Sequence, residues 1–599
     1  PQEPKEINLG VSIPMKGMTR GALNLAVTPV QEINISPRTL NVTPPSGITV
    51  PTVNPVSFQP VTPSIPAVSV DPVTPVTLSF AGSGNGDEEW ITPSGSVAPL
   101  AQQVLIGQSG GGTLDAVSFS TTGAQNFDLS LHNTDSTGIT GTAHVESGHG
   151  VQNFDWTGQT STHAVMKLVG SHTIDIQNMT MNFIGVGDKP SAYLMLFHTD
   201  AHNFPTQESI WKINANTTIN MSGRDIILYG VQSHASYTSG SGMLNSGTII
   251  ANADPSAVTS QGVNYTGLAP RERVIFTTID ADGGWVGAYN RYFYFTNETS
   301  GKIFLNGTSD VLSNYATPGS ATGGTVFTNN GEVILNGQNS IGVVLNPTVS
   351  TYGDSKIILN NALELRGDKS IGLQLTNSTL DLTKSVIKLN IGTAGNDINS
   401  TGNILGNDPN MVEKAVGVFQ SVAGTFTMDD YNIALGSNAK DSIGVIVQTG
   451  NMTLNNASKN NQIVSDGGIG NILLVADGGS STITTGANTL LEAKNGNAQI
   501  GVFSKSGGTV TNAGTLTMNG NGSIGAILNT GSTMTNTGNI SVTGGVYTDS
   551  LSNKTGSVGI AAQGAGSTFT STASGSSVIV DVSGKESTGL FADTGTINI

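Results

Sequence analysis

The chain has 599 residues, of which 77 are glycine and only 11% are charged. Its formal net charge of −17 and the lack of a basic stripe in the sequence disfavour nucleic-acid binding. It has no run of 18 apolar residues, so no segment is expected to cross a membrane as a helix. It also has no cysteine, which is typical of bacterial proteins that cross the periplasm unfolded, where stray disulfides would trap them.

Residues 1–85 form the first predicted region, which is rich in proline and valine. Sixteen of the 23 prolines lie in the first 100 residues, and the tripeptide Val-Thr-Pro recurs, for example at Val73–Pro75. Proline at this density disfavours helices and central strands and favours extended backbone. A disordered linker is the alternative, but valine and isoleucine recur through the region, so we expect an extended arm that lies on the rest of the protein.

Residues 86–330 form the second predicted region, which contains strand-like segments with a blurred repeat. All eight histidines lie between His132 and His234, and all four tryptophans precede residue 330. Bulky side chains and irregular loops accumulate where a protein recognises a partner. We therefore predict an elaborated, aromatic- and histidine-rich tip on a longer shaft.

Residues 331–599 form the third predicted region, in which a short phrase recurs. The phrase is a small polar residue, Val or Ile, Gly and then apolar residues, as in Ser442–Val447. Its nine copies have glycines at Gly342, Gly372, Gly417, Gly444, Gly470, Gly501, Gly525, Gly559 and Gly589. A second phrase, such as Thr511–Gly514 or Thr535–Gly538, lies between many of the copies.

Each repeat therefore holds two or three strands of four to six residues, separated by turn-forming residues. One repeat cannot bury its own apolar side chains, so the copies must stack. The sequence predicts an all-β fold: a right-handed parallel β-helix (solenoid) with an extended Pro-rich N-terminal arm. A β-propeller or sandwich array is the alternative, but the expected hairpin turns are missing. The residues one before the repeated glycine are expected to share one buried column.

This combination resembles the passenger of the large type V autotransporter adhesins of fusobacteria, the RadD-like proteins. The resemblance rests on the Pro- and Val-rich N-terminus and on repeats such as Gly522–Gly531 (GSIGAILNTG) and Thr535–Gly538 (TNTG). It implies a surface-displayed rod that attaches to other bacteria or host cells by binding a glycan or protein receptor. It also implies an anchor in the outer membrane through a C-terminal β-barrel that this chain lacks. The chain is accordingly expected to be a piece of a longer protein.

Catalytic patterns are weak in this sequence. The run Gly107–Gly111 fits Gly-x-Ser-x-Gly, but no helix follows the serine, as a nucleophile elbow requires. Asp280 and Asp282 are the best carboxylates for a polysaccharide-cleaving β-helix enzyme, which is the alternative function. We expect no enzymatic activity and no cofactor.

Histidine clusters offer two candidate metal sites. His198, Asp200 and His202 would share one face of a strand, and so would His144 and Glu146, with His149 close by. Exposed polar loops are the simpler interpretation of both sets, so no metal is expected. Arg366-Gly367-Asp368 matches the integrin-recognition tripeptide, although a Gly-Asp turn also suits any corner of the stack.

Aromatic residues give the best candidate binding site. Trp285, Tyr289 and Tyr292–Phe295 place six aromatic side chains within eleven residues. Alternation along a strand would direct Tyr292 and Tyr294 to one face, and Phe293 and Phe295 to the other. Exposed tyrosine and tryptophan offer rigid contact area for a ligand. The predicted ligand-binding residues are Trp285, Tyr289, Tyr292 and Tyr294, followed by His198 and His202, in a monomeric, extracellular adhesin.

Overall fold

The computed structural model describes Ile65, residues 68–75 and, with gaps, residues 117–599. The ranges within the second part are 117–119, 129–131, 141–147, 151–159, 163–169, 172–177, 180–187, 194–200, 210–223, 226–232, 240–252, 273–279, 292–315, 324–345, 355–376, 380–394, 411–455, 461–572, 580–584 and 586–599. Side chains are described mainly from residue 210 onward.

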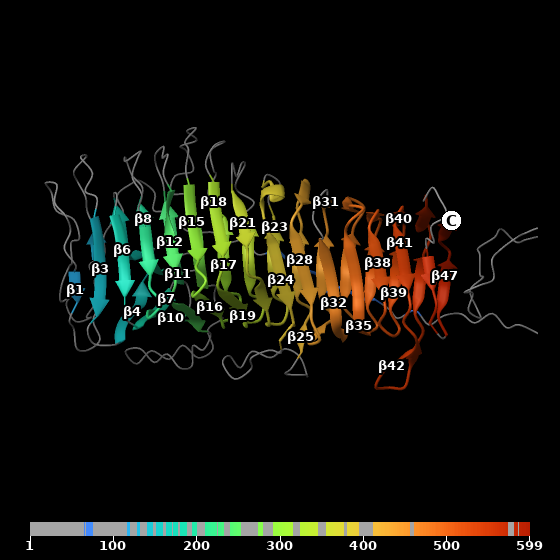
Figure 1. The fold of residues 1–599 in the computed structure, drawn as a ribbon, viewed down its shortest axis with the longest axis horizontal. Helices are drawn as coiled ribbons and strands as arrows, with labels where there is room; N and C mark the ends of the chain where they lie inside the picture. The colour runs from blue at the N-terminus through green and yellow to red at the C-terminus, as the bar shows by residue number, and fades with distance from the viewer. Residues whose placement is uncertain are drawn as a thin grey trace, which may run out of the picture.

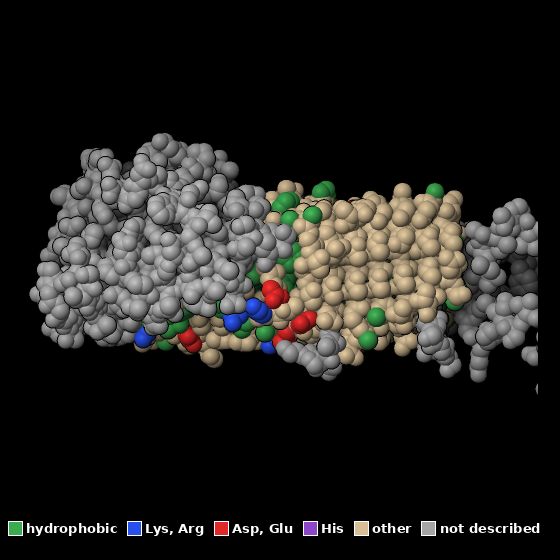
Figure 2. Space-filling model, turned by 90° about the horizontal axis from the view of Figure 1, so that it is seen from above, with side chains coloured by type: hydrophobic (Ala, Val, Ile, Leu, Met, Phe, Trp, Pro, Cys, Tyr) green, Lys and Arg blue, Asp and Glu red, His purple; other side chains and the backbone are tan. Residues whose placement is uncertain are grey.

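Most of the described residues lie in short β-strands that stack in parallel into a long shaft (Figure 1; seen from above in Figure 2). The chain contributes one strand to each of three sides and then repeats the cycle one rung further along. This arrangement is a parallel β-helix, so the predicted fold class is confirmed. The longest unbroken side has 15 strands among the described residues. At about 4.8 Å per rung, this side is about 67 Å long.

Four sheets build the three sides. Sheet 1 consists of β2 (Leu129–Leu131), β5 (His163–Val169), β8 (Leu194–Asp200), β11 (Ile226–Gln232), β14 (Arg273–Ile279), β17 (Val311–Tyr315), β20 (Ile341–Leu345), β23 (Ile371–Leu375), β26 (Val416–Gln420), β30 (Ile443–Val447), β33 (Ile472–Asp477), β36 (Ile500–Lys505), β39 (Ile524–Asn529), β44 (Val558–Gln563) and β47 (Thr588–Asp593). Sheet 2 consists of β4 (Val151–Gln159), β7 (Thr180–Gly187), β10 (Thr218–Gly223), β13 (Thr248–Asn252), β16 (Lys302–Leu305), β19 (Glu332–Leu335), β22 (Leu363–Leu365), β24 (Ile387–Ile391), β28 (Tyr431–Leu435), β32 (Gln462–Ile469), β35 (Leu490–Asn497), β38 (Thr515–Met518), β41 (Asn539–Val542) and β46 (Val580–Val582), with β25 (Val412–Glu413) and β29 (Ala439–Lys440) beside them.

The third side is divided between two sheets. Sheet 3N consists of β1 (Val117–Phe119), β3 (Gly141–Ser147), β6 (His172–Gln177), β9 (Ile210–Ile213), β12 (Gly240–Asn245), β15 (Tyr292–Asn297), β18 (Gly324–Asn329) and β21 (Lys356–Leu359). Sheet 3C consists of β27 (Thr425–Met428), β31 (Gly450–Leu454), β34 (Ser481–Thr485), β37 (Thr509–Asn512), β40 (Thr533–Asn536), β45 (Thr568–Ser571) and β48 (Thr596–Asn598). Between the two sheets, one rung carries the short 3-10 helix η2 (Leu382–Lys384), which buries Leu382.

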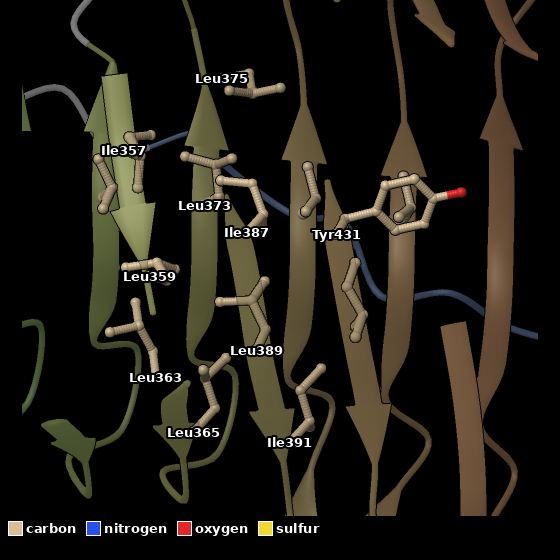
Figure 3. Packing of buried hydrophobic residues seen from close by; sticks show 14 of the residues in the cluster. Ile357, Leu359, Leu363, Leu365, Leu373, Leu375, Ile387, Leu389, Ile391 and Tyr431 are labelled. Atoms are coloured by element: carbon tan, nitrogen blue, oxygen red, sulfur yellow. The ribbon is translucent and has the colours of Figure 1, made fainter. Parts of the chain in front are cut away.

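The interior is filled by aliphatic side chains that lie above one another from rung to rung. Leu363, Leu389 and Ile433 occupy equivalent positions on successive strands of sheet 2. Figure 3 shows such side chains from opposite sheets pointing into the same interior space. Strands such as β24 and β37 alternate buried and partly exposed residues, which is why their apolar positions recur at intervals of two. Burial of these columns supplies the main driving force for folding.

Buried asparagines form hydrogen-bonded ladders at the corner where the third side is followed by sheet 2. The side-chain amide of Asn245 donates to Asn297 at 2.8 Å, and that of Asn297 donates to Asn329 at 2.9 Å. In the C-terminal half, Asn512 donates to Asn536 in the same way at 2.8 Å. An asparagine side chain both donates and accepts, so a column of them satisfies its own buried polar groups.

The repeated glycines are required by the distance between rungs. A Cβ atom on Gly342 would lie 2.3 Å from the carbonyl oxygen of Gly372, and one on Gly525 would lie 2.4 Å from that of Gly559. These glycines lie within strands, so the backbone of the next rung, and not a tight turn, excludes a side chain at these positions. Gly470 is an exception, because the residue that pairs with Ile443 is Ile472 and not Ile469. The copy predicted at Gly470 is therefore wrong, because the equivalent isoleucine, Ile472, lies three residues after Ile469.

The column that precedes the glycine lies on the outward face of sheet 1. Ile341 and Val344 point outward, whereas Val343 and Leu345 of the same strand belong to the interior. The outer stripe, as we call it, comprises Ile227, Val274, Val311, Ile341, Val344, Ile371, Val416, Phe419, Ile443, Ile446, Ile472, Val475, Ile500, Phe503, Ile524, Ile527, Val558 and Ala561. The predicted buried column of Ile341, Ile371, Val416, Ile443, Ile500, Ile524 and Val558 is confirmed as part of it.

The described part of the N-terminal arm packs on the outer stripe between Ile341 and Ile500. Ile65, Val68, Val70 and Val73 pack against it, and residues 68–75 carry no strand pairing. In Figure 3 this segment is the blue trace that crosses the strands. The predicted arm on the shaft is thus present for these residues; the remainder of region 1–85 lies outside the described residues.

A left-handed residue marks the corner between sheets 2 and 1 in rung after rung. Asn339, Lys369, Lys414, Asp441 and Ala498 all have φ between 50° and 60°. Each donates its backbone N–H to a carbonyl of the next rung, as Lys414 does to Lys440 at 2.9 Å. The left-handed conformation costs about 1 kcal/mol for a residue with a side chain, and the hydrogen bond around the corner offsets this cost.

We predict that Gly525→Ala destabilises the shaft because its Cβ would collide with the backbone of the next rung. Overpacking of this kind costs about 1–3 kcal/mol. Gly589→Ala is the matched control, since Gly589 has the equivalent place in the last rung and no atom lies within 4 Å of its added Cβ. Urea denaturation should show a lower midpoint for Gly525→Ala only; equal midpoints for the two variants would contradict the packing argument.

Candidate functional site

The aromatic segment is divided between the interior and the surface of sheet 3N. Phe293 and Phe295 are buried, with 5% and 0% of their surface exposed, while Tyr294 is half-buried on the outward face. The ring of Phe295 lies 5.7 Å from that of Phe327 in the next rung. The ring of Tyr294 lies against Gly242, where an added Cβ would come within 2.4 Å of its Cδ2 atom. The predicted alternation is therefore confirmed for Phe293, Tyr294 and Phe295.

The other predicted binding residues are only partly described. Tyr292 begins β15, and its backbone pairs with Gly240 and Gly324. His198 lies in β8, where it pairs with Gly230 and Lys167. Trp285, Tyr289 and His202 lie outside the described residues, so the clustering of the six predicted residues stays a prediction.

The structure describes the metal-binding and catalytic candidates only in part. Asp200 ends β8, and His144 and Glu146 lie in β3, but their side chains are not described. His149, Asp280, Asp282 and the run Gly107–Gly111 lie outside the described residues. Among the residues with described placement, no cluster of three or more His, Asp or Glu side chains could hold a metal ion.

The Arg366-Gly367-Asp368 tripeptide forms a corner between β22 and β23. Asp368 is only 2% exposed, and its carboxylate accepts the backbone N–H of Glu413 at 2.7 Å. Gly367 lies against the backbone of Gly337 in the preceding rung. A receptor that reads this tripeptide must reach the aspartate carboxylate, which here lies inside the stack. The geometry therefore favours the corner interpretation.

An ion pair is buried at the corner that precedes β17. Arg273 Nε lies 2.6 Å from Asp310 Oδ1, and the two side chains are 1% and 0% exposed. Asp310 also accepts the N–H of Gly307 at 2.7 Å. In the following rungs the same position holds Ser340 and Ser370, whose hydroxyls donate to backbone carbonyls. Burial raises the pKa of Asp310 to about 6, because the loss of hydration outweighs the charge of Arg273 and the hydrogen bond from Gly307.

A groove of about 880 Å³ runs between the arm and the outer stripe. The arm is held there by the ion pair between Asp71 and Lys414, whose charged atoms are 2.8 Å apart, and by a weak hydrogen bond from Gln448 to the carbonyl of Val73 at 3.5 Å. The hydrogen bond and charge of Lys414 lower the pKa of Asp71, and Asp71 raises the pKa of Lys414 in turn. Both ends of the pair are well exposed, so the apolar contacts carry most of the attachment.

Sequence reasoning missed two features of this region. It did not identify the Arg273–Asp310 pair, since the two residues are 37 positions apart and meet only through the rung register. It also did not anticipate that the apolar column would face outward under the arm. The density of valine in the arm could have indicated this arrangement, because an extended segment can bury its valines only against an apolar surface elsewhere in the protein.

We predict that Ile443→Asp releases the arm and leaves the shaft folded. Ile443 is 4% exposed beneath the arm, so the variant would bury an unpaired carboxylate unless the arm moves away. Limited proteolysis should then cut the arm faster, while circular dichroism of the strands is retained. The control, Val445→Asp, faces the interior and should unfold part of the shaft; unchanged cleavage of the arm in Ile443→Asp would contradict the assignment.

We also predict a pH dependence from Asp310. Its pKa is higher in the folded chain, about 6, than its ordinary value of 3.8, so the folded state binds the proton more tightly. This contribution to stability is present below pH 3.8 and is lost as the pH rises through about 6. Urea midpoints should reveal this decline, and Asp310→Asn should remove it. If Asp310→Asn shows the same decline of the urea midpoint with pH, a group other than Asp310 causes it.

Comparison with known proteins gives no match. No family model, no curated protein and no solved structure matches the chain. Among the described residues, no helix has the length and apolar character needed to cross a membrane.

Proposed function

We propose that this chain is the passenger of a cell-surface adhesin, a non-enzymatic rod that attaches to a glycan or protein receptor on other bacteria or host cells. The observation that carries the proposal is the uniform shaft. Strand after strand repeats the same register, and the polar groups at its corners bond to neighbouring rungs. Such a stack is well suited to hold a binding region away from a cell surface.

The N-terminal half of the shaft is the better place for receptor binding. Tyr294 is half-buried on the outward face of sheet 3N, and Tyr292 precedes it on the same strand. A tyrosine held against a strand presents rigid, amphipathic area at a small entropic cost, which is typical of residues that dominate binding. Trp285, Tyr289, His198 and His202 complete the proposed binding region.

The location that follows from this proposal is outside the cell, with the parent protein anchored in the outer membrane. The enzymatic alternative requires a pair of carboxylates at a defined separation across a sugar chain. Release of reducing ends from a polysaccharide by the purified chain would replace the adhesin proposal with that alternative.

We predict that Tyr292→Ala combined with Tyr294→Ala weakens attachment of the whole chain. Loss of an aromatic anchor costs about 2 kcal/mol, which is roughly 30-fold in affinity. The measurement is binding of chain-coated fluorescent beads to bacterial and epithelial cells, together with a glycan array.

The control for this experiment is Tyr547→Ala. Tyr547 is also half-buried, but it lies in β42 (Tyr547–Thr548), near the opposite end of the shaft. Attachment should persist in this variant. Equal attachment of the double variant and the control would show that the two tyrosines are not the binding residues.

A further inference from the structure

The outward face of sheet 3C is a regular array of threonines. Its first column, Thr425, Asn451, Thr482, Thr509, Thr533, Thr568 and Thr596, pairs in unbroken register across seven strands. Its second column, Thr427, Thr453, Thr484, Thr511, Thr535, Thr570 and Asn598, does the same. Six of the seven positions in each column are threonine, and every position is partly or fully exposed. We call these 14 positions the threonine lattice.

The lattice is held rigid from beneath. Ile483, Val510 and Met534 alternate with the threonines and are at most 1% exposed. At the ends of β37 and β40, the side-chain amide of Asn512 donates a hydrogen bond to that of Asn536. Because β-branched side chains have few rotamers, each threonine presents its methyl and hydroxyl groups in a nearly constant orientation.

Among the residues that the structure describes, no other face of the shaft has this composition. The outward positions of sheet 2 in neighbouring rungs include Glu492 and Asp581, and those of sheet 3N include Tyr294 and Lys356. The lattice itself contains no charged and no aromatic residue.

The spacing of the lattice selects a periodic ligand. Neighbouring threonines are about 4.8 Å apart across strands and about 6.7 Å apart along a strand. Hexagonal ice has oxygen repeats close to both distances on its prism faces. A hydroxyl can donate one hydrogen bond and accept two, so threonines that bond one another, as Thr533 and Thr509 do at 3.2 Å, keep acceptor capacity for water.

Two other occupants fit less well. Sugar chains are usually held by aromatic stacking, and the lattice has no aromatic residue. A second protein would gain little, because seven strands of four residues cover about 400 Å², half of the 800 Å² per partner that a stable interface buries. A solid with the same repeat gains more, because many weak contacts to one rigid ligand form together. After the first contact, the others cost little further translational or rotational freedom.

We propose that the outward face of sheet 3C binds ice, with water ordered over the threonine methyls and bonded to the hydroxyls. This inference is independent of the receptor site proposed above, whose Tyr292 and Tyr294 lie on sheet 3N.

The test is partition of the purified whole chain into slowly grown ice, together with inhibition of ice recrystallisation. The wild-type chain should be enriched in the ice fraction at least several-fold over serum albumin. Thr511→Lys, in the middle of the second column, should reduce that enrichment to the albumin level. Thr517→Lys is the matched control, because Thr517 is equally partly exposed on sheet 2 in the same rung, and it should behave as wild type.

Two results would overturn the proposal: a wild-type chain excluded from ice as albumin is, or equal loss of enrichment in both lysine variants. Cell attachment measured on the same samples separates the two proposals, since Thr511→Lys should leave it unchanged.

Discussion

The distance between rungs is the constraint on which this protein depends. Parallel strands about 4.8 Å apart bring identical positions of successive rungs into contact. At an inward position this distance suits leucine against leucine, and at a corner it suits one asparagine amide bonded to the next. At the strand glycines it leaves no room for a Cβ, as Gly342 against Gly372 shows. Contacts between successive rungs thus determine which residues recur in the repeated phrase.

Much of the fold could be predicted because its signals are local. Short β-branched runs between Gly, Asn and Ser identify strands, and the period of two assigned Phe293, Tyr294 and Phe295 to their correct faces. The left-handed corners escaped notice because Lys414 and Ala498 are not residues that mark this conformation. They adopt it because their backbone N–H groups donate to a carbonyl of the next rung. This contact depends on the stacking of the rungs and not on the local sequence.

The candidate sites were less predictable for the same reason. Whether the aspartate of Arg366-Gly367-Asp368 is accessible depends on Glu413, 45 positions later, which donates to its carboxylate. Gly470 resembled the repeated glycine but serves as a left-handed corner with φ of 70°, and Ile472 takes the position expected for Ile469. The threonine lattice went unrecognised because single Thr-x-Thr runs are common in strands, and only the register aligns them.

The hairpin of β42 and β43 (Lys554–Thr555) shows how this architecture accommodates added chain. Ile524 and Val558 remain paired although 34 residues separate them, against 24 between Ile500 and Ile524. The extra residues leave at the corner and end in a turn organised by Asp549, which accepts the backbone N–H groups of Leu551 and Asn553. Length is therefore unconstrained at this corner, so the shaft can acquire new loops, or carry a grafted peptide, without disturbing the rungs on either side.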